Sequence, residues 1–248
     1  MTWRDSRGST LTEYPRPSLA VDVALLTVLP GPGRALVEQA AAPPRPRSPA
    51  PPAQLAVLVH QRTDSAGPRG WSLPGTFVHE RERLAHAVLR ALREKTGVTG
   101  EDPRQLAVFD DPDRDPRGWV VAVAHADLVP RERLAGQLRE GCLLAPVLGD
   151  PVRAALPDGG DLVFDHPAIV ERAVAWAREA HDRDPDPRGL VGEEFTLAEL
   201  RRVHEAVAGS RLQKDTFRRR WEARLVATGR RRRGGVGKPA ELFRRREG

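Results

Sequence analysis

The chain has 248 residues, 40% of them hydrophobic, and a formal net charge of +6, which suffices for one large domain or for a medium domain joined to a small one. Its single cysteine, Cys142, excludes a disulfide framework, and the apolar neighbours in GCLLAP predict a buried, inert thiol. No secretory signal opens the chain and no apolar run approaches the roughly 18 residues of a membrane span, so we expect a cytoplasmic protein without a membrane partner.

The positive charge is concentrated near the C-terminus. Residues 190–248 contain 16 Arg and Lys against 8 Asp and Glu, whereas residues 1–189 contain 24 against 26. A compact basic module attached to a near-neutral one is typical of proteins with a polyanionic partner, most often nucleic acid. A solvated basic tail is the alternative, and the helical organisation described below argues against it for most of the region.

The first sixty residues predict a flexible start and two buried strands separated by a loop. Residues 1–17 are polar and contain Gly and Pro, so we expect them to be flexible. Residues 19–29, LAVDVALLTVL, and residues 55–62, LAVLVHQR, are rich in Val and Leu and predict strands, the second of which ends at Arg62. Residues 30–54 are dominated by Pro, Ala, Gly and Arg and predict a flexible loop within the domain.

The stretch from Trp71 to Val98 joins a Gly-containing loop to a helical pattern. Its apolar residues recur on one helical face, and Gly97 predicts a left-handed cap at the helix end. The stretch resembles the Nudix box: Gly, five residues, Glu, seven residues, then Arg-Glu-aliphatic-x-Glu-Glu-x-Gly-aliphatic. An ordinary amphipathic helix is the alternative. Counted back from Gly97, the arginine of the box is Arg90 and its three later acidic positions are Ala91, Glu94 and Lys95.

The acidic positions of the box are mostly lost. In Nudix enzymes these acids hold the divalent metals that polarise a pyrophosphate and position water, because Mg²⁺ prefers oxygen ligands. Here Ala91 supplies no ligand and Lys95 supplies a positive charge. The loop is also one residue off register, so that Arg81 or Glu82 falls at the early acidic position. The resemblance therefore implies a scaffold without catalytic residues, bound metal or other cofactor.

Residues 106–125 predict a hairpin. A short strand over 106–110 is followed by a polar turn over 110–118 and by a return strand from Trp119 to His125 with alternating side chains. We expect His125 to be a packed histidine and not a metal ligand, because no second His or Cys stands at ligand spacing.

The turn of this hairpin contains DRDPRG, residues 113–118. It resembles a signature of ADP-ribose-directed Nudix domains, which implies that Arg114 and Arg117 lie beside a nucleotide cleft, where guanidinium groups pair well with phosphates. A turn punctuated by Asp, Pro and Gly is the alternative. The full set of effector-binding residues that the resemblance implies is Arg62, Phe77, Arg90, Glu94, Arg114 and Arg117.

The next segments predict a short helix over 132–138, a short strand over 161–164 and a longer helix that Asp165 caps. The phrase FDHPAIVERAVAWAR is similar to the closing helix of Nudix domains. The Nudix resemblance therefore covers residues 18–181. HDRDPDPRGL follows without periodicity, and residues 182–193 are predicted to be a linker.

Two helices joined by a Gly turn are predicted beyond the linker. Thr196 and Glu199 have the spacing of a capping box, and an apolar stripe runs to Ala208. After the turn, a second helix begins at about Asp215, with Phe217, Trp221 and Leu225 facing inward. This is the helix-turn-helix arrangement, in which the second helix enters the major groove of DNA.

The second helix predicts a DNA-reading face, and the segment after it predicts a two-stranded wing. Thr216, Arg219 and Ala223 lie opposite the apolar side of this helix, where we expect contacts with base edges. The arginines beside them are expected to contact phosphates. Glycines between the arginine run and the apolar pair of Leu242 and Phe243 indicate the wing; a disordered basic tail is the alternative. The expected DNA contacts are Lys214, Thr216, Arg218, Arg219, Arg220, Arg224, Arg230, Arg231, Arg232, Arg233 and Lys238.

Together, EEFTLAELRRVHEAVAG, LQKDTFRRRW and GGVGKPAELFRR resemble the winged-helix domain of the Nudix-related transcriptional regulators that repress NAD-biosynthesis genes. The implied fold is α+β, a Nudix-like mixed-sheet α/β/α sandwich followed by a winged helix-turn-helix domain over residues 194–248. The implied function is that of a repressor that binds a palindromic double-stranded DNA operator as a homodimer and senses a nucleotide such as ADP-ribose. The long Pro-rich loop and the Pro-rich linker depart from the family.

Two other functions fit the sequence. The first is a working Nudix hydrolase of ADP-ribose or a related nucleoside diphosphate derivative, with a DNA-binding appendage and a rearranged acid set such as Glu80, Glu82 and Glu94. The second is a nucleic-acid-binding adaptor that responds to no small molecule. Loss of the catalytic acids would suit a sensor, because a protein that reports the concentration of an effector must release that effector intact.

Overall fold

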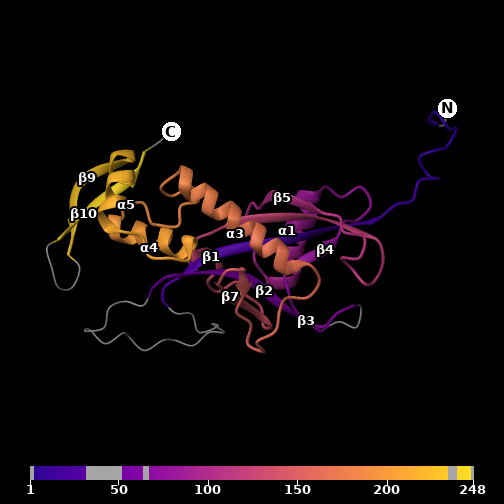
Figure 1. Cartoon of the computed structure of the whole chain (residues 1–248), viewed down its shortest axis with the longest axis horizontal. Coiled ribbons are helices and arrows are strands. Elements are labelled where there is room, and N and C mark those ends of the chain that lie inside the picture. Colours follow the sequence, from indigo (N-terminus) through magenta and orange to yellow (C-terminus); the bar gives the residue numbers. More distant parts are fainter. Residues whose placement is uncertain (1–2, 32–51, 64–66, 234–238, 247–248) are drawn as a thin grey trace.

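The computed structural model describes residues 3–31, 52–63, 67–233 and 239–246. Figure 1 shows an elongated molecule with a strand-rich part toward the N-terminus and a smaller part, made of α4, α5, β9 and β10, at the other end. Most of the predicted Pro-rich loop over 30–54, and Lys238 of the predicted wing, lie outside the described residues. In the part of the chain that is described, no helix is both long and apolar enough to span a bilayer.

The strand-rich part is built on one mixed sheet. Its main path runs β5-β6-β1-β2-β7-β8, with β3 paired to β2 and β4 paired to β1. β1 and β6 are parallel neighbours, whereas β1 and β2 are antiparallel. The strands are β1 (Ser18–Leu29), β2 (Gln54–Arg62), β3 (Gly70–Ser72), β4 (Gly75–Phe77), β5 (Arg104–Phe109), β6 (Val120–Leu128), β7 (Cys142–Leu148) and β8 (Arg153–Ala154).

Helices cover both faces of this sheet because β1 is apolar on both sides. Val23 and its odd-numbered neighbours pack with α1 (Leu84–Thr96), and Ala24 and its even-numbered neighbours pack with α3 (His166–Arg183). Gly97 ends α1 in the left-handed conformation, with a φ of 84°. The predicted α/β/α sandwich, the two long strands, the hairpin and the box helix are therefore confirmed.

The weakly periodic segments differ from the sequence predictions. No strand forms over residues 161–164: Val163 donates one hydrogen bond to the Trp71 carbonyl (2.9 Å), and Phe164 has a φ of 59°, which an extended strand does not allow. The predicted helix over 132–138 is the single turn α2 (Arg131–Leu134). Asp165 precedes α3 as expected, but its carboxylate binds Arg114 and does not cap the helix.

The C-terminal part has the predicted helix-turn-helix and wing. α4 (Leu197–Ala208) begins with the capping box, in which Glu199 N donates to Thr196 Oγ1 (3.2 Å) and Thr196 N to Glu199 Oε2 (2.7 Å). α5 (Lys214–Trp221) ends in a 3-10 turn, so that Leu225, predicted as a helical core residue, is buried at the start of β9 instead. β9 (Leu225–Arg232) and β10 (Ala240–Arg245) form the antiparallel wing.

The segment between α3 and α4 packs against the winged helix. Asp186 is buried, accepts a hydrogen bond from Leu190 N (2.7 Å) and pairs with Arg245 of β10. His204 of α4 donates from Nε2 to the Pro185 carbonyl (2.7 Å), and its ring contacts those of Phe217 and Trp221. The segment predicted as a linker is thus held against the winged helix by buried contacts.

These contacts give the fold a specific dependence on pH. Burial lowers the pKa of His204 from 6.5 to about 4, so its neutral form stabilises the fold above pH 6.5 and this contribution is lost as the pH falls toward 4. The loss is on the order of 3 kcal/mol. We expect urea denaturation to give a lower free energy of unfolding at pH 4.5 than at pH 7, and His204→Gln to flatten this decrease.

The exposed His86 provides a matched control, because His86→Gln should leave the pH dependence unchanged. His60 also has a pKa of about 4 and should account for part of the decrease that remains in His204→Gln. A decrease of the same size in wild type and His204→Gln would contradict the role of His204.

Candidate functional site

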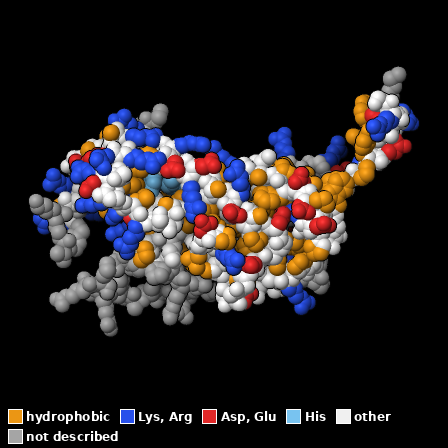
Figure 2. Space-filling view, in the orientation of Figure 1, with side chains coloured by type: hydrophobic (Ala, Val, Ile, Leu, Met, Phe, Trp, Pro, Cys, Tyr) orange, Lys and Arg blue, Asp and Glu red, His pale blue; other side chains and the backbone are white. Residues whose placement is uncertain are grey.

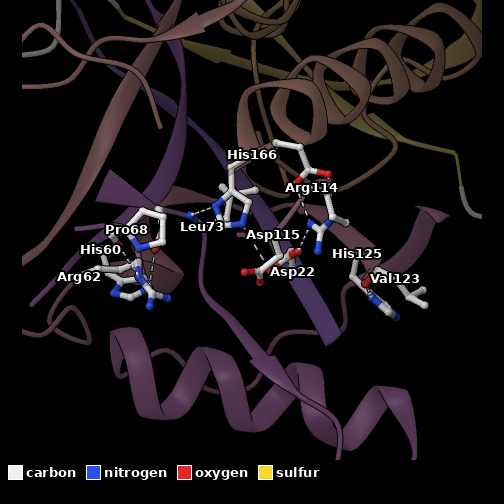
Figure 3. Close-up of polar contacts among 12 residues, drawn as sticks. Asp22, His60, Arg62, Pro68, Leu73, Arg114, Asp115, Val123, His125 and His166 are labelled. Carbon is white, nitrogen blue, oxygen red and sulfur yellow. Dashed lines mark hydrogen bonds and ion pairs between the residues drawn. The ribbon is translucent and has the colours of Figure 1, made fainter. Parts of the chain in front are cut away.

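A cavity of about 160 Å³ lies where the Gly-containing loop meets the first turn of α3. Figure 3 shows Asp22, Arg62, Arg114 and His166 converging on this region from different elements. Four of the six predicted effector-binding residues, Arg62, Phe77, Arg114 and Arg117, line the cavity, whereas Arg90 and Glu94 do not. The remaining lining residues are Ala20, Asp22, Leu73, Gly75, Thr76, Lys95, Asp115, Phe164 and His166.

Arg114 is buried and is held by two carboxylates. Its NH2 donates to Asp22 Oδ2 (3.1 Å) and to Asp165 Oδ1 (2.6 Å), and its Nε donates to Asp165 Oδ2 (2.8 Å). The resemblance implied a phosphate contact for this residue. In the structure its guanidinium instead joins β1, the 110–118 turn and the start of α3, and it thereby forms one wall of the cavity.

Asp22 and His166 are site residues that the sequence analysis missed. His166 Nδ1 accepts a hydrogen bond from Leu73 N (3.0 Å), so the ring proton is on Nε2, which faces Asp22 Oδ1 at 3.5 Å. Burial alone would raise the pKa of Asp22, but His166 and Arg114 lower it below its usual value. The available signal was a lone acid within LAVDVALL, because a buried carboxylate requires a partner.

The mouth of the cavity combines guanidinium groups with aromatic rings. The Arg117 Cζ lies 5.1 Å from the Phe77 ring centroid and 5.3 Å from that of Phe164, and the Arg62 Cζ lies 5.3 Å from the Phe164 centroid. Phe164 reaches this position through its left-handed backbone, a conformation that is uncommon for a bulky residue. Such a surface can take both a planar ring and an anion.

Arg90 fastens the loop to α1 from outside the cavity. Its Nε and NH2 donate to the two carboxylate oxygens of Glu82 (2.9 and 2.8 Å), NH1 donates to Thr76 Oγ1 (3.0 Å) and NH2 to the Phe77 carbonyl (2.9 Å). The hydrogen bonds from Arg90 lower the pKa of Glu82 to about 2. Of the two residues that the shifted register allowed, Glu82 and not Arg81 therefore faces the arginine of the box.

The other acidic positions of the box are divided between the core, the solvent and the cavity. Ala91 is buried in the interface of α1 with the sheet. The Glu94 side chain is half exposed, with Oε2 3.8 Å from Arg90 NH1, and Lys95 lines the cavity. Within the described ranges, no group of three or more His, Cys, Asp or Glu is arranged to hold a metal ion.

His60 and His125 are both buried on the sheet. His60 Nε2 lies 3.0 Å from Ser72 Oγ, and its pKa is lowered to about 4 by burial and then by the charge of Lys95. His125 Nδ1 donates to the Val123 carbonyl (3.0 Å), and burial lowers its pKa. His125 is thus the packed histidine that was predicted. Burial likewise raises the pKa of the Cys142 thiol, as expected for an inert cysteine.

The outer face of α5 is a candidate nucleic-acid interface. Thr216 and Arg219 are exposed side by side, with Arg219 NH2 3.4 Å from Thr216 Oγ1, and Lys214 begins the helix. Arg218 is bound by both carboxylate oxygens of Glu222 (2.7 and 2.8 Å). The helical phase predicted from the sequence therefore places Thr216 and Arg219 on the outer face.

Arg220 and Arg224 contact α3 and do not extend from the α5 face. Arg220 NH2 donates to the Asp182 carbonyl (2.7 Å) and lies 3.2 Å from its carboxylate, and Arg224 NH1 donates to the Arg183 carbonyl (2.7 Å). Both guanidinium groups lie over the Trp221 ring. Cations suit this position because the last carbonyl groups of a helix carry partial negative charge. Arg220 and Arg224, which were predicted to contact phosphates, thus form hydrogen bonds within the chain.

The arginines over residues 230–233 of the wing are all exposed, and within the described residues those with an ion pair alternate with those without one. Arg230 pairs with Glu194 (2.9 Å) and Arg232 with Glu199 (2.8 Å), whereas Arg231 and Arg233 are exposed and have no ion pair with any described residue. Figure 2 shows basic side chains spread over this end of the molecule, with acidic ones between them.

The chain matches two family models in the order of its two parts. The NUDIX domain matches residues 51–142, and the NrtR DNA-binding winged helix domain matches residues 187–245. An Acinetobacter baylyi protein named ADPR responsive transcriptional repressor NtrR is 28% identical over 236 residues, which are 94% of this chain and 84% of that protein. An ADP-ribose pyrophosphatase of Methanocaldococcus jannaschii is 29% identical over 48% of this chain and 66% of its own length.

A solved structure spans both parts. The crystal structure of Shewanella oneidensis NrtR complexed with a 27mer DNA aligns with a TM-score of 0.65 and 31% sequence identity, over 92% of this chain and 93% of that one. The likeness covers the sandwich, the junction and the winged helix together. This chain therefore belongs to the NrtR family of Nudix-related transcriptional regulators.

Proposed function

We propose that this chain is a DNA-binding transcriptional repressor whose Nudix domain binds ADP-ribose, or a closely related nucleotide, without hydrolysing it. The observation that carries the proposal is that one helix, α3, touches both candidate sites: His166 at its start lines the cavity, and its last turn is bound by Arg220 and Arg224 of the winged helix. The named ADP-ribose response of the Acinetobacter relative and the DNA complex of the Shewanella protein support it.

The effector would bind at the mouth of the cavity. Its planar base would stack on Phe77 or Phe164, and its phosphates would lie against Arg62 and Arg117, because guanidinium groups pair with phosphate oxygens and aromatic rings stack on bases. Arg90 and Arg114 would not contact the effector directly. Arg90 would hold the Gly-containing loop in place, and Arg114 would hold the cavity wall at the start of α3.

The set of oxygen ligands around the cavity supports binding without turnover. A hard divalent cation needs several oxygen ligands, but Ala91 offers none, Glu82 is bound by Arg90 and Glu94 lies outside the cavity. The residues present therefore do not fit the metal that a Nudix hydrolase requires. The relative named as a pyrophosphatase keeps hydrolysis as the second candidate; release of phosphate-containing products from ADP-ribose with Mg²⁺ would establish it.

The DNA side of the proposal rests on α5 and the wing. Thr216 and Arg219 would face base edges in the major groove, and the exposed Arg231 and Arg233 would contact phosphates. A homodimer would present two such helices to a palindromic operator, with the half-site spacing set by the angle between them.

α3 would couple the two sites. It has 18 residues and is therefore about 27 Å long. Its first turn contacts the cavity, and its last turn contacts the winged helix. An effector that moves the first turn would move the winged helix with it. For this coupling, the effector must bind the DNA-binding form and the non-binding form of the protein with different affinity. A ~100-fold preference, about 2.8 kcal/mol, is enough to shift the equilibrium between these two forms substantially.

Arg117→Ala should weaken ADP-ribose binding by about tenfold or more, because it removes a cation–π partner and a phosphate contact from the mouth of the cavity. Isothermal titration calorimetry measures the change. Arg104→Ala, an exposed arginine on β5, is the control and should bind as the wild type does. Equal affinities for the two variants would place the effector elsewhere.

Arg219→Ala should weaken binding to an operator selected by the wild-type protein by about 1–3 kcal/mol, with a much smaller effect on random duplex. Arg231→Ala should weaken binding to both DNAs alike and reduce the slope of log K against log salt by about one. Fluorescence anisotropy over a salt series measures both. Equal losses on operator and random DNA for Arg219→Ala would remove α5 from base readout.

The double variant Arg220→Gln, Arg224→Gln should retain ADP-ribose affinity but lose most of the change in operator affinity that ADP-ribose causes, because the winged helix is no longer tied to the last turn of α3. Operator titrations with and without ADP-ribose give this coupling. The double variant Arg202→Gln, Arg211→Gln, which changes two exposed arginines in and after α4, controls for the loss of two positive charges. Undiminished coupling in the double variant would argue for another route between the sites.

A further inference from the structure

Lys95 is a cation at a position where the Nudix box has an acid. It lies in the last turn of α1 and lines the cavity together with Asp22, Arg62 and His166. Its side chain is half-buried, so that it is partly enclosed by the residues of the site.

The charge of Lys95 has no partner of opposite charge among the described residues. No carboxylate of the described residues forms an ion pair with it, whereas Arg114 is bound to Asp22 and Asp165, and Arg117 to Asp115. The field of the ammonium also reaches into the sheet, where it helps to lower the pKa of the buried His60. The cavity therefore has an excess of positive charge at its α1 side.

This excess lies where a Nudix hydrolase would hold its metal. The box acids, had they been present, would have made this side of the cavity negative and dependent on a divalent ion for any anionic ligand. Replacement of an acid by Lys95 changes the local charge by two units and supplies three N–H donors on a flexible stem. An ammonium with these donors can bind phosphate oxygens directly.

We propose that the Lys95 ammonium takes the place of the divalent cation and binds the diphosphate of the effector, so that a nucleoside diphosphate ligand is recognised without Mg²⁺. The identity of the ligand class rests on the proposed function, but the role of Lys95 is separable from it. A cation built into the helix makes occupancy of the site independent of the metal concentration and leaves no metal-bound water to attack the pyrophosphate.

The test is calorimetric titration of the full chain with ADP-ribose in EDTA and again in Mg²⁺. We expect the wild-type affinity to agree within about twofold between the two buffers, and Lys95→Met to lose about tenfold or more in both, as expected for a lost charge-assisted hydrogen bond. Arg93→Met is the matched control: it removes the same charge from an exposed position two residues away on the same helix and should bind as the wild type does.

Two further titrations separate a direct contact from a structural role. Inorganic pyrophosphate should lose affinity in Lys95→Met as ADP-ribose does, whereas adenosine, which has no phosphate, should bind both proteins alike. Lys95→Glu reverses the charge at this position and should bind ADP-ribose more weakly than Lys95→Met in both buffers. Thermal melts of each variant in the absence of ligand verify that the chain is folded.

The outcomes distinguish this inference from the function on which it rests. Wild-type binding that requires Mg²⁺, or Lys95→Met binding equal to the wild type in EDTA, would overturn the role of Lys95 and leave the repressor proposal intact. Failure of the wild type to bind either ADP-ribose or pyrophosphate in both buffers would overturn the sensing half of the proposed function and, with it, the role of Lys95.

Discussion

The site depends on the buried pairing of Arg114 with Asp22 and Asp165. This cluster joins the central strand of the sheet, the tip of the β5–β6 hairpin and the start of α3, which are far apart in sequence. Loss of Arg114 would leave the buried Asp22 without its ion-pair partner, and an uncompensated buried charge is strongly destabilising. The first turn of α3, and with it His166 and the cavity wall, is therefore held by this ion-pair cluster as well as by the apolar packing of Ile169 and Val170.

The loop side of the site keeps the arginine-to-loop contacts of a Nudix box, although Ala91 and Lys95 stand at two of its acidic positions. Arg90 still ties helix to loop through Glu82, and Gly75 still lies so close to Asp22 that an added Cβ would collide with the carboxylate. What has changed is the lining: Ala91 is core, and Lys95 brings a positive charge to the cavity. The side chain of α1 that fastens the loop, Arg90, is thus distinct from those at the acidic positions of the box, Ala91, Glu94 and Lys95.

Local patterns predicted most of the fold but only part of the site. Strong periodicity gave the long strands, the box helix and the capping box at Thr196, since each is decided by neighbours in sequence. Residues 161–164 misled because Phe164 adopts a left-handed backbone, which an apolar run does not reveal. His166 was missed because its partners are distant in sequence, and the contact of Arg220 with α3 was missed because helical phase carries no information about α3.

The continuity of α3 has a consequence for how proteins of this architecture can vary. Because the helix is unbroken from the cavity to the winged helix, adding or removing one residue within it would rotate the winged helix by about 100° and displace it by about 1.5 Å relative to the cavity. Substitutions can change side chains along α3 during evolution. A single-residue insertion or deletion, however, would change the orientation of the winged helix relative to the cavity. Length changes should therefore accumulate outside α3, in the surface loops of the sandwich.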